Sequence, residues 1–224
     1  MNSLLEHGVR DVLNGDADFD GAREYALDRL ARELSPRLYY HNLYHTRDDV
    51  APAAARFAQM EDIAPNQRNL LLTAVYFHDI GFTFAPEDHE MRSADTAADI
   101  LPRFNFSPEQ VQVVRGLILV TRLFTPPRSL LEAVMVDADL DILGRADFYE
   151  RNRELRREFA AQGKRFSDRQ WYTQQLRFLQ VHQYRTDSAQ ATRNPQKREN
   201  MHLLTQLLAR VKTPPYTPIS AEGD

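Results

Sequence analysis

A histidine and an aspartate stand side by side at the end of an apolar helical run. The run begins at Leu70, and the pair is His78-Asp79, followed by Ile80 and Gly81. An imidazole and a carboxylate at the end of a buried helix cost free energy unless something compensates them, and a divalent metal ion does this well. Alone, the pair is equally compatible with a helix end that carries a surface Asp and a capping His. The interpretation therefore depends on the rest of the chain.

Two further groups of residues have matching chemistry. His41 and His45 are four positions apart, so on one helix they would share a face. Residues 134–143 form an apolar helical segment interrupted by three carboxylates, Asp137, Asp139 and Asp141. Acidic residues are rarely fully buried unless they are paired or bind a metal. Alternate positions spread around a helix, so at most one or two of these carboxylates can face a common site.

One combination of these residues forms a ligand set. Two imidazoles and two carboxylates from three predicted helices could converge on one divalent ion: His45, His78, Asp79 and Asp139. Nitrogen and oxygen ligands suit Mn²⁺, Fe²⁺, Mg²⁺, Co²⁺, Ni²⁺ or Zn²⁺, with water completing the coordination, and disfavour soft ions. The chain has no cysteine, which excludes thiolate ligands, disulfides and cysteine nucleophiles.

Composition sets the class of protein. A chain of 224 residues fits one domain with a real core, and 42% hydrophobic and 27% charged residues are typical of a soluble globular protein. A net charge of −4 argues against general nucleic-acid binding. No apolar run is long enough to span a membrane, and residues 1–10 lack a signal sequence. We therefore expect a cytoplasmic protein without a membrane partner; the oligomeric state stays open.

Helical periodicity predicts an all-α protein. Only 8 glycines occur, and alternating β-branched residues are scarce. Caps and breakers predict helices over residues 22–34, 38–60, 67–78 with Asn66 as N-cap, 88–101, 107–121, 129–142, 147–162, 167–184 and 187–211, with a loop at 82–88. Within 38–60, Pro52 should either kink the helix or mark its true start. No linker divides the chain, so a single domain is expected over residues 1–211, followed by a flexible tail at 212–224.

The order of the candidate ligands resembles the HD superfamily of metal-dependent phosphohydrolases. That superfamily has a His, a His-Asp pair and a late Asp on an all-helical core, and the matching segments are Tyr40-His41-Asn42-x-x-His45, His78-Asp79 and Ala138-Asp139-Leu140. The first segment also looks like the opening of the cyclic-nucleotide phosphodiesterase signature. The chain is more similar to bacterial HD-domain proteins with related motifs at residues 89–93 and 143–148. The resemblance covers residues 38–144 and leaves 145–211 as a helical extension.

The resemblance implies a fold and a division of roles. The fold is an all-α HD-domain helical bundle in which His45, His78, Asp79 and Asp139 are the metal ligands. His41 matches the histidine that protonates the leaving oxygen, and Asp79 or Asp139 would guide a proton of the attacking water. Asn42 matches a neighbour of that histidine and is an expected substrate-binding residue. Independently of the resemblance, Arg122 is a cation that could contact a phosphate and is the other expected substrate-binding residue. In many relatives of the bacterial type, a histidine follows the Thr of a Leu-Ile-Leu-x-Thr helix. Here the segment continues as Thr121-Arg122-Leu123-Phe124, and Phe124 can neither bind a metal nor donate a proton. Any role of that histidine in the relatives is therefore absent here.

The expected function is metal-dependent hydrolysis of a phosphomonoester or phosphodiester, with nucleotides among the candidate substrates. One spare histidine, His89, lies between Asp79 and Asp139. We therefore expect a mononuclear site, or a second ion held mainly by water and carboxylate oxygens. A dinuclear oxygenase, which needs more histidines in that interval, is disfavoured. The sequence leaves one alternative open, a non-catalytic HD module that binds a nucleotide or a protein partner in signalling.

Overall fold

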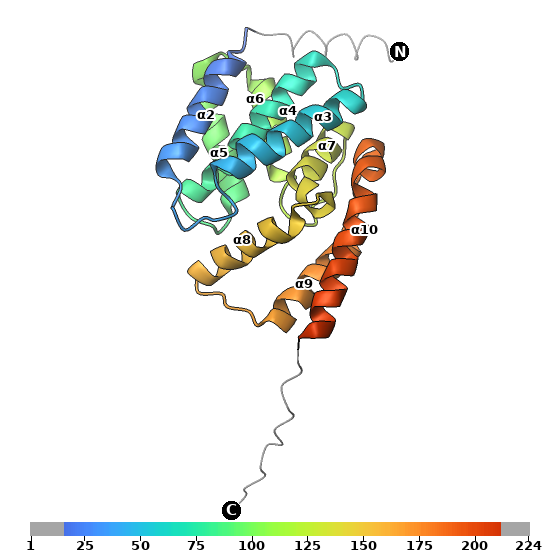
Figure 1. The fold of residues 1–224 in the computed structure, drawn as a ribbon. Helices are drawn as coiled ribbons and strands as arrows, with labels where there is room; N and C mark the ends of the chain where they lie inside the picture. The colour runs from blue at the N-terminus through green and yellow to red at the C-terminus, as the bar shows by residue number, and fades with distance from the viewer. Residues whose placement is uncertain (1–15, 212–224) are drawn as a thin grey trace, which may run out of the picture.

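The computed structural model describes residues 16–211, which form helices and no strand (Figure 1). The α-helices are α2 (Phe19–Glu33), α3 (Ala51–Met60), α4 (Pro65–Phe77), α5 (His89–Ile100), α6 (Pro108–Leu119), α7 (Leu130–Asp139), α8 (Phe148–Ala161), α9 (Asp168–Val181) and α10 (Asp187–Arg210). A π-helix, η1 (His45–Val50), precedes α3, and three 3₁₀ turns are η2 (Ile80–Thr83), η3 (Leu101–Phe104) and η4 (Asp141–Gly144). The predicted all-α class is confirmed.

Two capping predictions agree with the structure, and several boundaries differ. Ser107 and Ser167 form capping boxes at the starts of α6 and α9. The helix α4 begins at Pro65 with Ala64 as N-cap, so the prediction of Asn66 as N-cap was wrong. Proline is favoured at the first helical position because its missing N–H would have no partner there.

The second predicted helix also starts later than expected. Residues 39–42 form bends, and the helical backbone begins only after Asn42. Pro52 lies in the first turn of α3, directly after η1, where a missing backbone N–H is tolerated. The chain therefore passes from a π-helix into an α-helix at this point.

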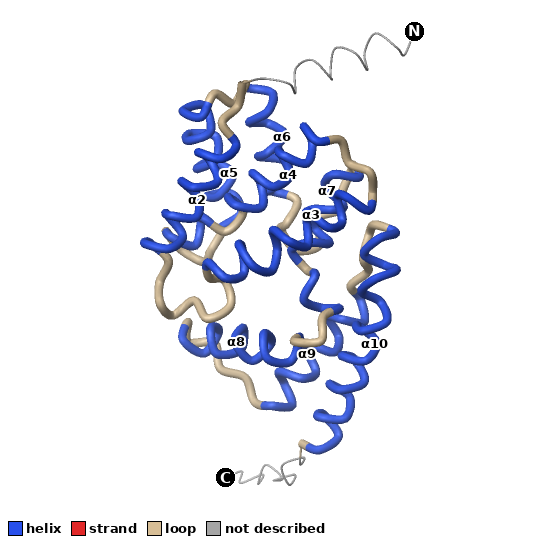
Figure 2. The backbone as a smooth tube through the Cα atoms, turned by 45° about the horizontal axis from the view of Figure 1, so that its top comes forward, coloured by secondary structure: helices blue, strands red, loops and turns tan. Residues whose placement is uncertain are grey.

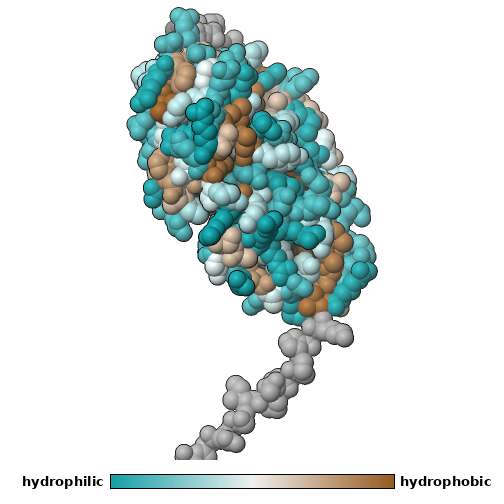
Figure 3. Space-filling model, turned by 60° about the vertical axis from the view of Figure 1, so that its left-hand side comes forward, coloured by the Kyte–Doolittle hydropathy of each residue, from teal (hydrophilic) through white to brown (hydrophobic). Residues whose placement is uncertain are grey.

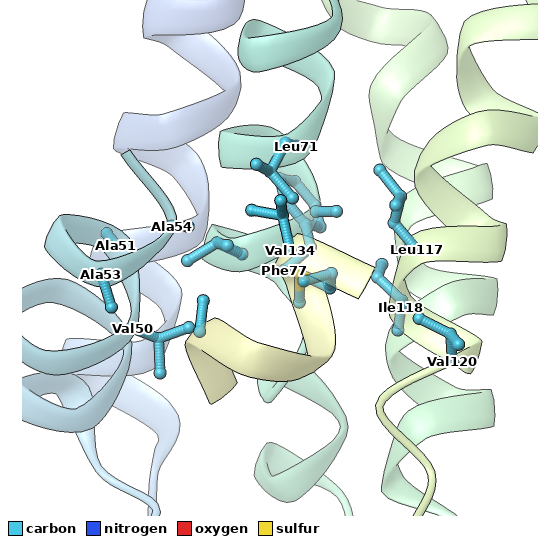
Figure 4. Close-up of a cluster of buried hydrophobic side chains, with 14 of the residues drawn as sticks. Val50, Ala51, Ala53, Ala54, Leu71, Phe77, Leu117, Ile118, Val120 and Val134 are labelled. Atoms are coloured by element: carbon cyan, nitrogen blue, oxygen red, sulfur yellow. The ribbon is translucent and has the colours of Figure 1, made fainter. Parts of the chain in front are cut away.

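The core lies between α3, α4, α6 and α7. Figure 4 shows Leu71 and Phe77 of α4 and Val134 of α7 facing the small residues of α3, and all three are fully buried. Each fully buried side chain of this size contributes about 1.5–3 kcal/mol to stability. Alanines along α3 allow the backbones to approach closely, which draws the ends of α4 and α7 towards η1.

Helices α8, α9 and α10 lie against one end of this bundle (Figures 1 and 2). The buried Asp137 of α7 accepts hydrogen bonds from the backbone N–H groups of Arg185 and Thr186, just before α10. Trp171 of α9 donates its indole N–H to Asn152 of α8 at 2.7 Å. These contacts attach the extension to the helix that ends in Asp139.

One face of the molecule is mainly hydrophilic (Figure 3). On the face in Figure 3, hydrophobic residues form short strips between polar ones. Within residues 16–211, no helix is both long and apolar enough to cross a membrane. Residues 1–15 and the predicted tail at 212–224 lie outside the described part, and a single domain over residues 1–211 stays a prediction.

Candidate metal centre

Side chains from three elements converge at one point. His45 begins η1, His78 and Asp79 follow the end of α4, and Asp139 is the last residue of α7. Asp139 Oδ1 lies 3.4 Å from His45 Nε2 and 3.3 Å from His78 Nε2. Asp79 Oδ2 lies 3.4 Å from His78 Nε2 and 3.8 Å from His45 Nε2. Ligand atoms bound to one ion at ordinary bond lengths lie about 3.0–3.5 Å apart, so these separations are close to those of a metal site.

The cluster compensates its own charge with protons. Burial alone would lower the pKa of His78, but the charges of Asp79 and Asp139 raise it to about 9. Burial alone would also lower the pKa of His45, but the carboxylates of Asp139, Asp49 and Asp79 together raise it. Both imidazoles hold the pKa of Asp139 far below its usual range despite the cost of burial. A divalent ion would take the place of the protons on the two imidazoles.

The outer nitrogens of both imidazoles face polar groups. His78 Nδ1 donates to the carbonyl of Val75 at 2.7 Å, which directs Nε2 into the cluster. His45 Nδ1 faces Asp49 Oδ2 at 3.8 Å. Asp49 in turn forms ion pairs with Arg145 at 2.5 Å and Arg151 at 2.9 Å. Sequence reasoning missed Asp49 and Arg151, whereas Arg145 belongs to the motif at residues 143–148.

His41 lies near the cluster but not where it was expected. It occupies a bend before η1, so the prediction that it shares a helix face with His45 was wrong. Its Nδ1 lies 2.5 Å from Oε1 of Glu158, a buried residue of α8. Burial raises the pKa of Glu158, but the contact with His41 and the hydrogen bonds from the backbone N–H groups of Tyr40 and His41 together hold it below its ordinary value. The His41 ring stacks on Phe82 with ring centroids 4.5 Å apart.

Glu158 was missed for an identifiable reason. It follows a stretch of alternating Arg and Glu in residues 150–157 that has the pattern of a solvent-exposed helix face. The carboxylate nevertheless accepts hydrogen bonds from the backbone N–H groups of Tyr40 and His41, at 2.9 and 3.0 Å. No local signal distinguishes Glu158 from its charged neighbours, because its partners are more than a hundred positions away in the chain.

The predicted substrate-binding residues do not join the cluster. The Asn42 side chain donates to the Tyr39 carbonyl and accepts from the His45 N–H, so it stabilises the turn that leads into η1. Arg122 is exposed and pairs with Asp88 at 2.8 Å. Neither residue lines the cavity described below. His89 does line it, and its Nε2 lies 3.9 Å from Asp79 Oδ1.

The cluster opens into a cavity of about 490 Å³. The lining of the cavity includes His41, His45, His78, Asp79 and Asp139. It also includes residues of α8 and α9 and residues near η4. The C-terminal extension therefore completes a cavity that the motif segments begin.

The fold can be compared with that of known proteins. No protein-family model and no curated protein sequence matches the chain. Among solved structures, the chain is similar to a predicted HD superfamily hydrolase from an uncultured Thermotogales bacterium, with a TM-score of 0.56. The chain has the fold of the HD superfamily. The two sequences are 19% identical, and the match covers 83% of this chain and 91% of that chain. Residues 38–144 are less than half of the chain, so the shared HD fold includes helices outside the motif segments.

Proposed function

We propose that the protein is a metal-dependent phosphohydrolase that cleaves a small phosphomonoester or phosphodiester, with nucleotides among the candidates. The observation that carries the proposal is the convergence of two imidazoles and two carboxylates at the base of a cavity, beside a histidine that a buried glutamate orients. The HD fold supports the same reading, because the similar structure is described as a predicted hydrolase of that superfamily.

The residues present fit a divalent ion. His78 Nε2 and Asp79 Oδ2 are buried and have no hydrogen-bond partner, although both face the other members of the cluster. Leaving buried polar atoms unpaired costs about 1–3 kcal/mol each, which an ion bound between them would remove. The chemistry that such an ion supplies when bound is polarisation of a phosphoryl oxygen and a lower pKa for an adjacent water.

The remaining residues manage the protons of hydrolysis. The water oxygen forms a bond to phosphorus, the bond from phosphorus to the leaving oxygen breaks, and one proton must move from water towards the leaving oxygen. Asp79 or Asp139 would steer the proton that the water gives up. Because the His41 Nδ1–H is directed at Glu158, its Nε2 is the ring nitrogen available to give a proton to the leaving oxygen.

A metal and substrate panel tests this function. The protein is purified without chelators, its metal content is measured, and nitrophenyl phosphate, bis-nitrophenyl phosphate and nucleotides are assayed with Mn²⁺, Mg²⁺, Co²⁺ and Ni²⁺. We expect hydrolysis that EDTA abolishes and that added metal restores. Stoichiometric metal without turnover of any phosphoester would contradict the proposal and favour a non-catalytic binding module.

A further inference from the structure

The cavity wall carries more negative than positive charge. Four carboxylates line it, whereas Lys164 is the one Lys or Arg among its described lining residues; the carboxylates belong to Asp79, Glu90, Asp139 and Glu158. A divalent ion would offset Asp79 and Asp139, and Glu158 is paired with His41. Glu90 faces His89 at 3.6 Å, and its charge is equal in size and opposite in sign to that of Lys164. The Lys and Arg side chains among the described lining residues therefore give no surplus of positive charge for a second or third phosphate group.

A further cation, Arg37, lies outside this cavity. It lines a smaller groove of about 260 Å³ that shares Phe82, Pro86 and Gln162 with the main cavity. Its neighbours in that groove include the carboxylate of Glu33, so the groove does not carry a surplus of positive charge.

Apolar side chains form a large part of the cavity wall beyond the cluster. They come from α8, α9 and the turns beside α7: Leu123, Leu140, Phe148, Leu155, Phe159 and Phe178. Asn152 lies among them, but its amide is already bonded to Trp171 and to Gln175. Polar side chains of the same region, Gln162, Lys164 and Gln174, also line the cavity. The apolar side chains nevertheless offer a surface on which apolar area gains about 25 cal/mol per Å².

The apolar wall continues to the cavity mouth. Leu123 is 53% exposed although it lines the cavity. The next residue, Phe124, has φ 68°, a left-handed conformation that bulky residues rarely adopt, and its ring meets Phe178 edge-on at 6.4 Å. The loop therefore adds apolar area at the entrance.

From these charges and surfaces we propose that the site acts on a single phosphate group carried by a bulky, mainly apolar alcohol, such as an aryl or long alkyl group. This inference rests on the proposed phosphohydrolase function. The phosphate lies at the metal cluster, and the apolar group lies along α8 and α9. Nucleoside polyphosphates and small sugar phosphates match this cavity poorly, the first because of charge and the second because of polarity.

Binding of alkyl phosphonates tests the apolar wall without requiring turnover, since the carbon–phosphorus bond is not hydrolysed. Ethyl, butyl and octyl phosphonate are titrated calorimetrically into the Mn²⁺-loaded protein. We expect affinity to increase with chain length, by up to about fourfold for each buried methylene. Leu123→Ser should weaken octyl phosphonate several-fold and leave ethyl phosphonate unchanged. Leu130→Ser is the matched control, because Leu130 is 47% exposed but does not line the cavity.

Displacement of octyl phosphonate by AMP and by ATP, at constant free Mn²⁺, tests the charge argument. We expect AMP to compete better than ATP. Affinity that is independent of chain length, or tighter binding of ATP, would overturn the inference. If nitrophenyl phosphate is hydrolysed but the affinity for alkyl phosphonates does not depend on chain length, only the inference about the apolar wall is contradicted. If the affinity depends on chain length but no phosphoester is hydrolysed, only the proposed function is contradicted.

Discussion

At the scale of residues, the two histidines of the first motif have different surroundings. His45 Nε2 faces Asp139 and Asp79 inside the cluster. His41 contacts a carboxylate from another helix, and its ring lies beside that of His45 with centroids 5.8 Å apart. The spacing of four residues suggested equal orientation, but the bend before η1 separates their roles. Replacing His41 and replacing His45 should therefore have different effects on metal content and turnover.

His45→Ala should reduce both metal content and activity, because it removes a ligand. His41→Ala should keep the metal content of the wild type and slow turnover by about 10²–10⁴-fold, the usual cost of losing a positioned acid. The deficit should shrink with nitrophenolate, a leaving group that needs little protonation. His202→Ala is the control, since His202 is an exposed residue of α10. Loss of metal in His41→Ala would show that His41 is itself a ligand.

Glu158→Gln tests whether the contact with His41 matters for turnover. Glutamine keeps the size of the side chain but removes the charge that orients the His41 Nδ1–H. We expect unchanged metal content, a lower kcat with poor leaving groups and a shifted acidic or basic limb of the pH–rate profile. An unchanged profile combined with lower thermal stability would assign Glu158 a structural role only.

The pKa of His78 predicts how metal stabilisation depends on pH. It rises from 6.5 to about 9 on folding, so protonated His78 stabilises the metal-free protein below pH 6.5, and this contribution is lost as the pH rises through 9. Metal binding displaces that proton and tightens by about tenfold per pH unit over the same range. The increase in melting temperature caused by Mn²⁺, measured anaerobically, should therefore grow from pH 6.5 to pH 9. If the increase in melting temperature caused by Mn²⁺ stays constant or becomes smaller with rising pH, the metal ion does not replace the proton of His78.

At the scale of elements, the start of α5 packs tightly on the turn after the His-Asp pair. A Cβ added to Gly81 would lie 2.1 Å from the backbone oxygen of His89. The Gly81 N–H also donates to the buried Ser93 hydroxyl at 2.8 Å. The turn η2 and α5 are therefore fixed against each other, next to Asp79.

Gly81→Ala should destabilise the protein by about 1–3 kcal/mol, because backbone atoms would have to move apart. Gly116→Ala is the matched control: its added Cβ meets no atom within 4 Å, and the change should stabilise α6 by about 0.5–1 kcal/mol. Denaturant unfolding of both variants measures the difference. Equal stability of the two variants would show that the close approach of α5 to Gly81 is not needed.

Sequence patterns identified some elements better than others. Ser107 and Ser167 were recognisable as capping residues because their partners are three positions away. The π-helix at His45–Val50 was not predicted, since its geometry depends on packing against α3, α4 and α7. Within the site, the order of His45, His78, Asp79 and Asp139 was informative. Asp49 and Glu158 could not be identified from the sequence, because their partners, Arg151 and His41, are distant along the chain.

At the scale of the whole molecule, the cavity depends on both halves of the chain. The motif segments supply the cluster, and α8 and α9 supply Glu158 and most of the apolar wall. The buried Asp137 attaches the start of α10 to the helix that carries Asp139. The extension is thus part of the site rather than an appendage, which the motifs alone did not indicate.

The metal centre is tested most directly by anomalous diffraction from crystals of the Mn²⁺-loaded protein. The expected result is a single anomalous peak about 2.0–2.3 Å from His45 Nε2, His78 Nε2 and a carboxylate oxygen of both Asp79 and Asp139. Absence of a peak at this cluster, or two ions that each have histidine ligands, would contradict a mononuclear centre built from these four side chains.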